Sequence, residues 1–171
     1  ENYYFNKKYS YDKNPSYKYS LLSENEKENF IKSISWVLNR IVCISGKVII
    51  NNKCDDFELY SENEENLLKI FINEIVNKYD KSWLWVTYNG LNFDNPLIMR
   101  KAMKYNIPIS NENFKNLRKF SKYPHYDCCA ILGAWGNENV DFETACKFFG
   151  IENPKSGSTN GGNISISTPE E

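Results

Sequence analysis

The alternation of hydrophobic and polar positions predicts that the chain's first ordered element is a hairpin. Residues 40–50, RIVCISGKVII, are apolar and β-branched, which favours a strand. Residues 51–53, NNK, then favour a turn, and residues 54–60, CDDFELY, alternate as a second strand. The two strands are expected to pair in antiparallel fashion across this turn.

Residues 62–80 show the clearest helical period in the chain. Apolar residues recur along one face of a 3.6-residue period, namely Leu67, Leu68, Phe71, Ile72, Ile75, Val76 and Tyr79. Ser61 can cap the start of this helix, and Glu64, three residues later, would complete a capping box. We therefore expect an amphipathic helix that buries its apolar face.

A short apolar run and a second helix follow. Residues 83–88, WLWVTY, are almost continuously apolar, which is typical of a strand buried on both faces. Asn95 and Pro96 can open a helix, because proline is tolerated in a first helical turn. The buried side of this helix would be lined by Leu97, Ile98, Ala102 and Tyr105.

The last predicted elements are short. Residues 125–132, HYDCCAIL, indicate a strand or a strand that runs into a short helix. Residues 141–149 indicate a helix that ends at Gly150 and turns Phe142, Ala145 and Phe149 inward. This order of strands and helices predicts an α/β fold, with a mixed sheet flanked by helices.

The two ends of the chain lack a clear period. Residues 1–35 are typical of an irregular arm or insertion within a domain that spans 1–155. Residues 156–171 are typical of a flexible tail or a truncated loop. In open α/β sheets ligands gather at strand ends, so the loop that follows residues 83–88 is the expected site.

The composition favours a globular domain and excludes one class of protein. The chain has 171 residues, 41% of them hydrophobic, and a formal net charge of -1, which fits one globular domain and excludes a strongly basic nucleic-acid coat. Acidic residues gather in 55–80 and basic residues in 96–126. The basic segment forms either a face suited to a phosphate backbone or an ordinary solvated surface.

Cysteine and histidine usage argues against several kinds of metal site. The five cysteines are odd in number and lack C-x-x-C spacing, and the single histidine argues against a multi-histidine site. Free thiols fit the cytoplasm or another reducing intracellular compartment. No apolar run approaches the roughly 20 residues of a membrane span, so no membrane partner is expected.

The stretch YNGLNFDNP, residues 88–96, places one carboxylate, Asp94, at the start of a helix. An aspartate there often caps free backbone N–H groups and contributes about 1 kcal/mol. The same position can project the carboxylate into a cleft, where Mg²⁺ takes oxygen ligands. From spacing alone both roles stay open, and a metal-binding role needs further ligands.

The stretch YNGLNFDNPLIMRKA resembles the second exonuclease motif of family-B DNA polymerase proofreading domains and of their stand-alone bacterial and viral relatives. That motif reads roughly Y-N-x-x-x-F-D-x-P, and Tyr88, Asn89, Phe93, Asp94 and Pro96 match it. The flanks NRIVCISGKVI, HYDCCAILGAWG and VDFETACKFFGIENPK resemble neighbouring segments of the same family, so the resemblance covers about residues 36–155. It implies the ribonuclease-H-like fold of DEDD exonucleases.

The resemblance also implies a site. In that family four acidic residues bind two divalent ions, Mg²⁺ or Mn²⁺, and the third of them corresponds to Asp94. Glu1 is the candidate for the first motif, D-x-E, and is otherwise an exposed terminal residue. Tyr88, Asn89 and Phe93 would shape the substrate cleft, where Phe93 either stacks on a base or packs in the core.

Two of the family's motifs are incomplete in this chain. No complete D-x-E pair precedes the first strand, and the late helical Y-x-x-x-D motif is missing after PKSG. Tyr123 to Asp127 spells Y-x-x-x-D, but Pro124 opposes the helix that this motif requires. We therefore interpret Asp127 as a decoy, and we expect the missing carboxylates to lie outside the given chain or to be lost.

The leading hypothesis is a DEDDy-like 3′–5′ exonuclease that removes nucleotides from single-stranded DNA by two-metal hydrolysis. DNA is favoured over RNA, and replication or repair proteins are the expected partners. The alternative is a catalytically incomplete ribonuclease-H-like module that binds nucleic acid or protein, with the basic segment 100–122 as its nucleic-acid contact.

Overall fold

The computed structural model describes residues 23–25, 27, 37, 39–79, 82–138 and 140–151. The chain divides into two units, one formed by Glu1–Arg40 with Ser158–Glu171 and the other by Ile41–Gly157. Nearly all of the described residues belong to the second unit. The tail expected at 156–171 lies outside the described residues, as does most of the arm expected at 1–35.

The predicted hairpin is confirmed. Strand β1 (Cys43–Ile50) pairs antiparallel with β2 (Lys53–Tyr60), and Ile50 faces Lys53 next to the turn. Asn51 and Asn52 take φ values of 48° and 63°. Two successive residues with positive φ make the tight turn that matches strand twist, and asparagine tolerates that conformation better than most side chains.

The predicted helix after the hairpin is confirmed, but its cap is not. Helix α4 (Glu64–Phe71) continues as the π-helical turn η1 (Ile72–Val76), and Asn63 caps it by accepting a hydrogen bond from the Asn66 N–H. The expected cap by Ser61 and Glu64 is wrong, because Glu64 turns inward instead. Its carboxylate accepts hydrogen bonds from the Ile41 N–H and from the Tyr105 hydroxyl, both at 2.7 Å.

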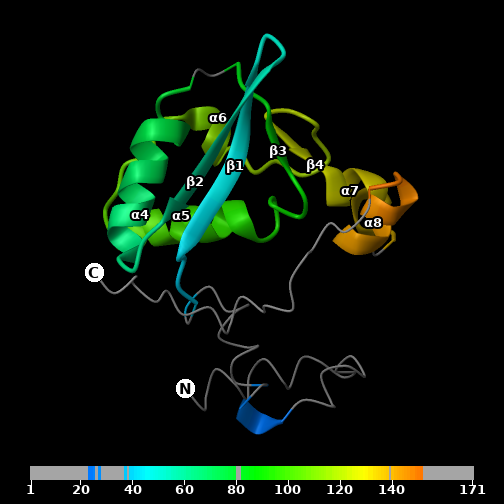
Figure 1. Ribbon diagram of the computed structural model, residues 1–171, viewed down its shortest axis with the longest axis horizontal. Helices are drawn as coiled ribbons and strands as arrows, with labels where there is room; N and C mark the ends of the chain where they lie inside the picture. The colour runs from blue at the N-terminus through cyan, green and yellow to red at the C-terminus, as the bar shows by residue number, and fades with distance from the viewer. Residues whose placement is uncertain are drawn as a thin grey trace. The chain divides into compact units, whose positions relative to one another are not determined.

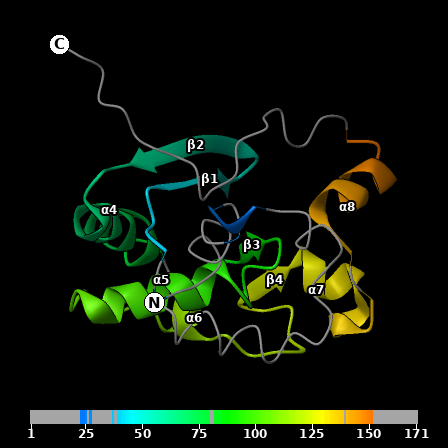
Figure 2. The same cartoon turned by 90° about the horizontal axis from the view of Figure 1, so that it is seen from below.

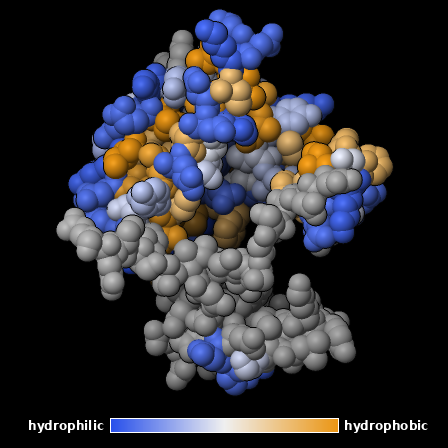
Figure 3. Space-filling view, in the orientation of Figure 1, coloured by the Kyte–Doolittle hydropathy of each residue, from blue (hydrophilic) through white to orange (hydrophobic). Residues whose placement is uncertain are grey.

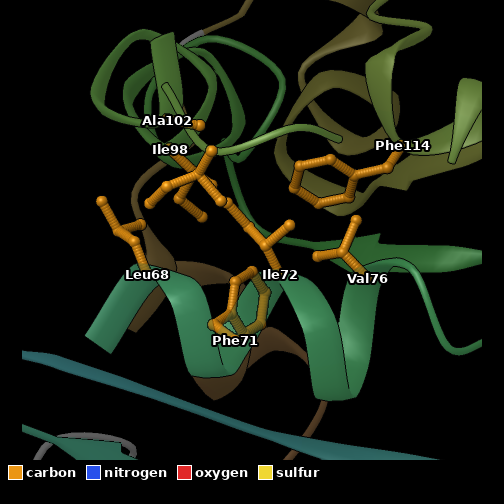
Figure 4. Close-up of a cluster of buried hydrophobic side chains, with 8 residues drawn as sticks. Leu68, Phe71, Ile72, Val76, Ile98, Ala102 and Phe114 are labelled. Atoms are coloured by element: carbon orange, nitrogen blue, oxygen red, sulfur yellow. The ribbon is translucent and has the colours of Figure 1, made fainter. Parts of the chain in front are cut away.

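The hydrophobic core lies between α4, η1 and the helices that follow them, α5 (Asp94–Lys104) and α6 (Glu112–Lys115) (Figure 4). Its buried residues are Leu68, Phe71, Ile72, Val76, Ile98, Ala102, Ile107 and Phe114. The inward face predicted for the second helix is thus confirmed at Ile98 and Ala102. The hairpin covers this core with Ile44, Phe57 and Leu59.

A second, parallel pair of strands carries the segment singled out from the sequence. Strand β3 (Trp85–Thr87) runs beside β4 (His125–Asp127), with Thr87 opposite Asp127. The expectation of burial on both faces is wrong, because Val86 is 63% exposed. Side chains alternate along a strand, so Trp85 packs on Phe114 with ring centroids 5.0 Å apart while Val86 points to the other face.

The mixed α/β architecture is confirmed, whereas the described strands form two separate two-stranded sheets rather than one. The hairpin rests on α4 through side chains, with the Phe57 and Phe71 rings 6.2 Å apart. Its link to the rest of the unit is therefore apolar packing rather than backbone hydrogen bonds to β3. The ribonuclease-H-like sheet stays a prediction.

Three short helical segments complete the unit: α7 (Cys128–Leu132), η2 (Ala134–Gly136) and α8 (Phe142–Phe148). Figures 1 and 2 show α7 and α8 on one side of β3 and β4, and α4, α5 and α6 on the other. The predicted last helix is confirmed, and it ends at Gly150, whose φ of 71° suits glycine.

The inward face expected for the last helix is partly wrong. Ala145 and Cys146 are buried, whereas Phe149 is 59% exposed and Phe142 is 37% exposed. The small side chains, not the aromatic ones, face the unit, and hydrophobic surface therefore remains at the end formed by α7 and α8 (Figure 3). None of the described helices is long and apolar enough to cross a membrane. All five cysteines are free thiols.

Candidate active site

The loop between β3 and α5 is a compact turn built around Asn89 and Gly90. Asn89 has a φ of 62°, and its carbonyl oxygen accepts hydrogen bonds from the Asn92 N–H at 3.3 Å and the Phe93 N–H at 3.1 Å. The Gly90 carbonyl oxygen accepts a further hydrogen bond from the Asn95 N–H at 2.9 Å. The Asn-Gly pair therefore turns the chain directly from the strand into the helix.

Gly90 lies against the end of β3. A Cβ atom at this position would lie 2.4 Å from the Thr87 hydroxyl oxygen and 2.5 Å from the Thr87 Cβ atom. Both distances are shorter than van der Waals contact allows, so a larger residue would push the loop or Thr87 away. The absence of a side chain at Gly90 sets how closely the loop approaches the strand.

Asp127 holds this loop from the neighbouring strand. Its side chain is completely buried, and its carboxylate accepts hydrogen bonds from the Asn89 N–H at 2.8 Å and the Leu91 N–H at 2.9 Å. One of the same oxygens also accepts a hydrogen bond from the Ala130 N–H at 3.2 Å and caps α7. A buried carboxylate is costly unless it is hydrogen-bonded, and here three backbone donors offset that cost.

This arrangement explains why the Y-x-x-x-D spelling at residues 123–127 is misleading. Asp127 ends strand β4 and does not lie within a helix. Both of its oxygens are hydrogen-bonded to the backbone. Its role in the structure is to connect the start of α7 to the loop that carries Asp94.

Asp94 is the first residue of α5, and its helix start has no side-chain cap. The capping role that spacing allowed for Asp94 is therefore wrong. Its side chain is exposed, yet the pKa of Asp94 is raised, first by burial of the carboxyl group and then by the negative charge of Asp127. A hydrogen bond from the Asp94 backbone N–H opposes this shift in the pKa. Protein thus surrounds the carboxyl group on one side and leaves the other side open to solvent.

The first turn of α5 is tied to β4 and α6 by a buried histidine. The Asn95 side-chain nitrogen lies 3.0 Å from His125 Nδ1, and His125 Nε2 lies 3.0 Å from the Phe114 carbonyl oxygen. Burial lowers the pKa of His125, which favours the neutral ring. A carbonyl oxygen can only accept, so Nε2 donates to Phe114 and Nδ1 accepts from Asn95.

Tyr88 and Phe93 point to different surroundings. The Tyr88 hydroxyl donates to the Val140 carbonyl oxygen at 2.8 Å, and its ring contacts Phe142 edge-on, with centroids 5.1 Å apart. Tyr88 therefore anchors the loop to the start of α8. Phe93 is 39% exposed beside Asp94, so it does not pack in the core.

Asn89 is exposed, and its side-chain oxygen accepts a hydrogen bond from the Asn92 side chain at 3.1 Å. Asn89, Phe93 and Asp94 therefore lie along one exposed turn. Tyr88 anchors that turn through its hydrogen bond to the Val140 carbonyl oxygen.

Of the metal ligands expected from the sequence, Asp94 lies among the described residues. Asp94 suits a hard cation, because it is an exposed oxygen donor that forms no ion pair with any described residue. Within the described ranges, no three histidine, cysteine, aspartate or glutamate side chains come together in a way that could hold a metal ion. Glu1, the second ligand expected from the sequence, lies outside those ranges.

Sequence reasoning missed the supporting roles of Asp127, Asn95 and His125. An aspartate directly before a helical pattern is a common cap signal, so the contact of Asp127 with Ala130 could have been found. The contacts of Asp127 with Asn89 and Leu91 join residues 38 and 36 positions apart. No local sequence signal indicates contacts of that kind.

The comparison with known families gives a match over most of the chain. Residues 28–161 match the family of predicted 3′–5′ exonucleases related to the exonuclease domain of PolB. This match covers more than half of the chain, and the chain belongs to that family. No curated protein and no solved structure gives a significant match to this chain.

Proposed function

Since the chain belongs to a family of predicted exonucleases, we propose that it removes nucleotides one at a time from the 3′ end of single-stranded DNA, using divalent metal ions. The observation that carries this proposal is the state of Asp94. Its carboxylate is exposed on a hydrogen-bonded turn, and its pKa is raised first by partial burial and then by the charge of Asp127. A bound cation would relieve this repulsion between two carboxylates, as expected of a metal ligand.

Asp94 and Glu1 would hold Mg²⁺ or Mn²⁺ together with the other two acidic ligands of the family's site. Two such ions, when bound, activate water and stabilise the leaving oxygen in phosphodiester cleavage. Two backbone hydrogen bonds to Asp127, from Asn89 and Leu91, fix the turn that carries Asp94. Fixed ligands of this kind lower the reorganisation that a reaction requires.

The exposed turn also offers groups for the substrate. The Phe93 ring, partly exposed beside Asp94, can stack on a terminal base, which contributes roughly 1–3 kcal/mol per base. Asn89 presents a side-chain amide on the same turn. Stacking of this kind needs an unpaired base, which favours a single-stranded end over a duplex.

The direct test is nuclease activity of the full chain on 5′-labelled single-stranded DNA with Mn²⁺. We expect a ladder of products shortened from the 3′ end, and a loss of about 100-fold or more in Asp94→Asn, which keeps the size of the side chain but removes its charge. Glu1→Gln is expected to reduce the rate in the same way. The matched control is Asp141→Asn, because Asp141 is an exposed cap of α8 and asparagine caps equally well.

Two results would refute the proposal. One is the absence of any nucleotide release with either Mg²⁺ or Mn²⁺. The other is release that Asp94→Asn leaves unchanged. RNA of the same sequence, tested in parallel, decides between the two nucleic acids.

A second function is favoured by one specific observation. The basic residues of the segment 100–122 suit a module that binds nucleic acid without cleaving it. This alternative predicts that the chain binds labelled DNA equally well with Mn²⁺ and with EDTA. It also predicts that the DNA stays intact in both solutions.

A further inference from the structure

The segment between α6 and β4 is an exposed basic loop. Residues 116–124 read NLRKFSKYP and contain no acidic residue. Arg118, Lys119 and Lys122 are all exposed, and none of them forms an ion pair with another described residue. Three unpaired cations within five positions attract a polyanion through simple Coulomb forces.

Phe120 lies between these charges in the sequence and pairs with the half-buried Trp135. Phe120 is 74% exposed, and its ring contacts Trp135 of η2 with centroids 5.4 Å apart and an interplanar angle of 49°. Both residues have left-handed backbones, with φ values of 60° and 61°. That conformation costs an aromatic residue about 1–2 kcal/mol, and burial of the Phe120 ring does not offset this cost.

The loop that presents Phe120 is anchored at several points. The Tyr123 hydroxyl accepts a hydrogen bond from the Asn113 side chain at 2.9 Å, and the Ser121 hydroxyl donates to the Tyr123 carbonyl oxygen at 2.6 Å. At the end of the loop, the Pro124 carbonyl oxygen accepts a hydrogen bond from the Trp85 N–H at 2.9 Å. These contacts hold the loop that carries Phe120, whose ring is in contact with Trp135.

We propose that Phe120 and Trp135, with Arg118, Lys119 and Lys122, form a second binding site for a single nucleic-acid strand, apart from the turn that carries Asp94. Unpaired bases stack on the aromatic pair while the three cations contact phosphates. An acidic peptide would satisfy the cations but would gain little from flat rings. This site extends the proposed function, because it would hold the strand behind the end that is cleaved.

The fold connects the basic loop to the Asp94 turn through one short strand. The basic loop enters β4 at His125, and β4 ends at Asp127, which holds the turn before Asp94.

The test is binding of the full chain to a fluorescent oligothymidylate about 15 nucleotides long, in EDTA so that no cleavage occurs. Phe120→Gly is the main variant, because glycine accepts the positive φ of this position and the loop keeps its shape. We expect binding to weaken by roughly tenfold, and Phe120→Trp to restore it. Phe148→Ala, which removes an equally exposed ring from α8, is expected to bind as the unaltered chain does.

Two further probes separate stacking from charge. Replacing Arg118, Lys119 and Lys122 together by serine should reduce the slope of log affinity against log salt by about 2, because each phosphate contact contributes about 0.7 in a single strand. A strand of abasic sites should bind the unaltered chain and Phe120→Gly equally. An acidic peptide that competes with the oligothymidylate would show that the cations serve a protein partner and would overturn the proposal.

The outcome is independent of the nuclease proposal. If Phe120→Gly weakens binding and the unaltered chain releases no nucleotides with Mn²⁺, the nuclease fails and this site stands. If the chain degrades DNA and Phe120→Gly binds the oligothymidylate as tightly as before, this site fails and the nuclease stands. Circular dichroism of Phe120→Gly checks that any weaker binding does not come from unfolding.

Discussion

Two aspartates lie at helix starts in this protein, Asp127 before α7 and Asp94 in α5. They differ in burial and in hydrogen bonding. Asp127 is completely buried before α7, and backbone N–H groups occupy both of its oxygens. Asp94 opens α5 with an exposed side chain and caps nothing. The same residue type, at neighbouring positions of a helix start, is structural in one case and available for chemistry in the other.

The difference comes from what surrounds each carboxylate. A buried carboxylate is stable only when donors satisfy it, so Asp127 draws two segments of the chain together. The pKa of Asp94 is raised first by partial burial of its carboxyl group and, to a smaller degree, by the charge of Asp127. The hydrogen-bonded carboxylate of Asp127 thus fixes the turn that carries Asp94. Its negative charge also makes ionisation of Asp94 less favourable.

The largest expected effect comes from removing the structural member of the pair. Asp127→Ala leaves three backbone N–H groups without their acceptor and opens a buried gap, so we expect a loss of about 3 kcal/mol in the free energy of unfolding. Urea denaturation measures it. Asp141→Ala removes an exposed cap and serves as the control. Equal losses in the two variants would show that Asp127 is no more than a cap.

Gly90→Ala tests whether the turn depends on its close approach to β3. The added Cβ would meet Thr87 at 2.4 Å, so we expect the free energy of unfolding to fall by about 1–3 kcal/mol. All the clashing atoms belong to the Thr87 side chain. The penalty should therefore vanish when Gly90→Ala is made in a Thr87→Gly chain, and a penalty that persists there would contradict this account.

His125 gives the scaffold a smaller, pH-dependent contribution. Burial lowers the pKa of His125 below its ordinary value of 6.5, so the unfolded chain takes up a proton at a higher pH than the folded chain does. The free energy of unfolding should be highest above pH 6.5 and should fall as the pH drops through the lowered pKa. Urea denaturation across this range measures the fall, which should be absent in His125→Gln.

Asp94→Asn should have the smallest effect on stability, and in the opposite direction. The pKa of Asp94 is raised above 3.8, so ionising this residue destabilises the folded chain as the pH rises through the raised pKa. At neutral pH, Asp94→Asn should increase the free energy of unfolding by no more than about 1 kcal/mol, because solvent screens an exposed charge. Thermal denaturation at neutral pH and well below the ordinary pKa of aspartate measures this.

The gain should disappear in acid, where both chains are neutral at this position. An Asp94→Asn chain that is less stable than the unaltered one at neutral pH would contradict the unsatisfied state assigned to Asp94. Together with a loss of nuclease activity, a gain in stability would mark Asp94 as a residue kept for chemistry.

Local patterns predicted most of the elements. The hairpin, its Asn-Asn turn and the inward face of α5 follow from short-range periodicity and turn preferences. The wrong predictions have tertiary causes. Glu64 accepts hydrogen bonds from Ile41 and Tyr105 in place of the predicted capping contact. On the last helix Ala145 and Cys146 are buried, whereas Phe149 is exposed. Neither choice is visible in a window of a few residues.

The sequence by itself determined the turn at YNGLNFDNP, the helix after it and the place of one carboxylate at their junction, because these depend on neighbouring residues. Only the tertiary structure decided which aspartate is satisfied and which is exposed. That choice rests on hydrogen bonds between residues 36 and 38 positions apart, which form when β3 and β4 pair side by side. Distant parts of the chain supply those donors, and packing alone brings them together.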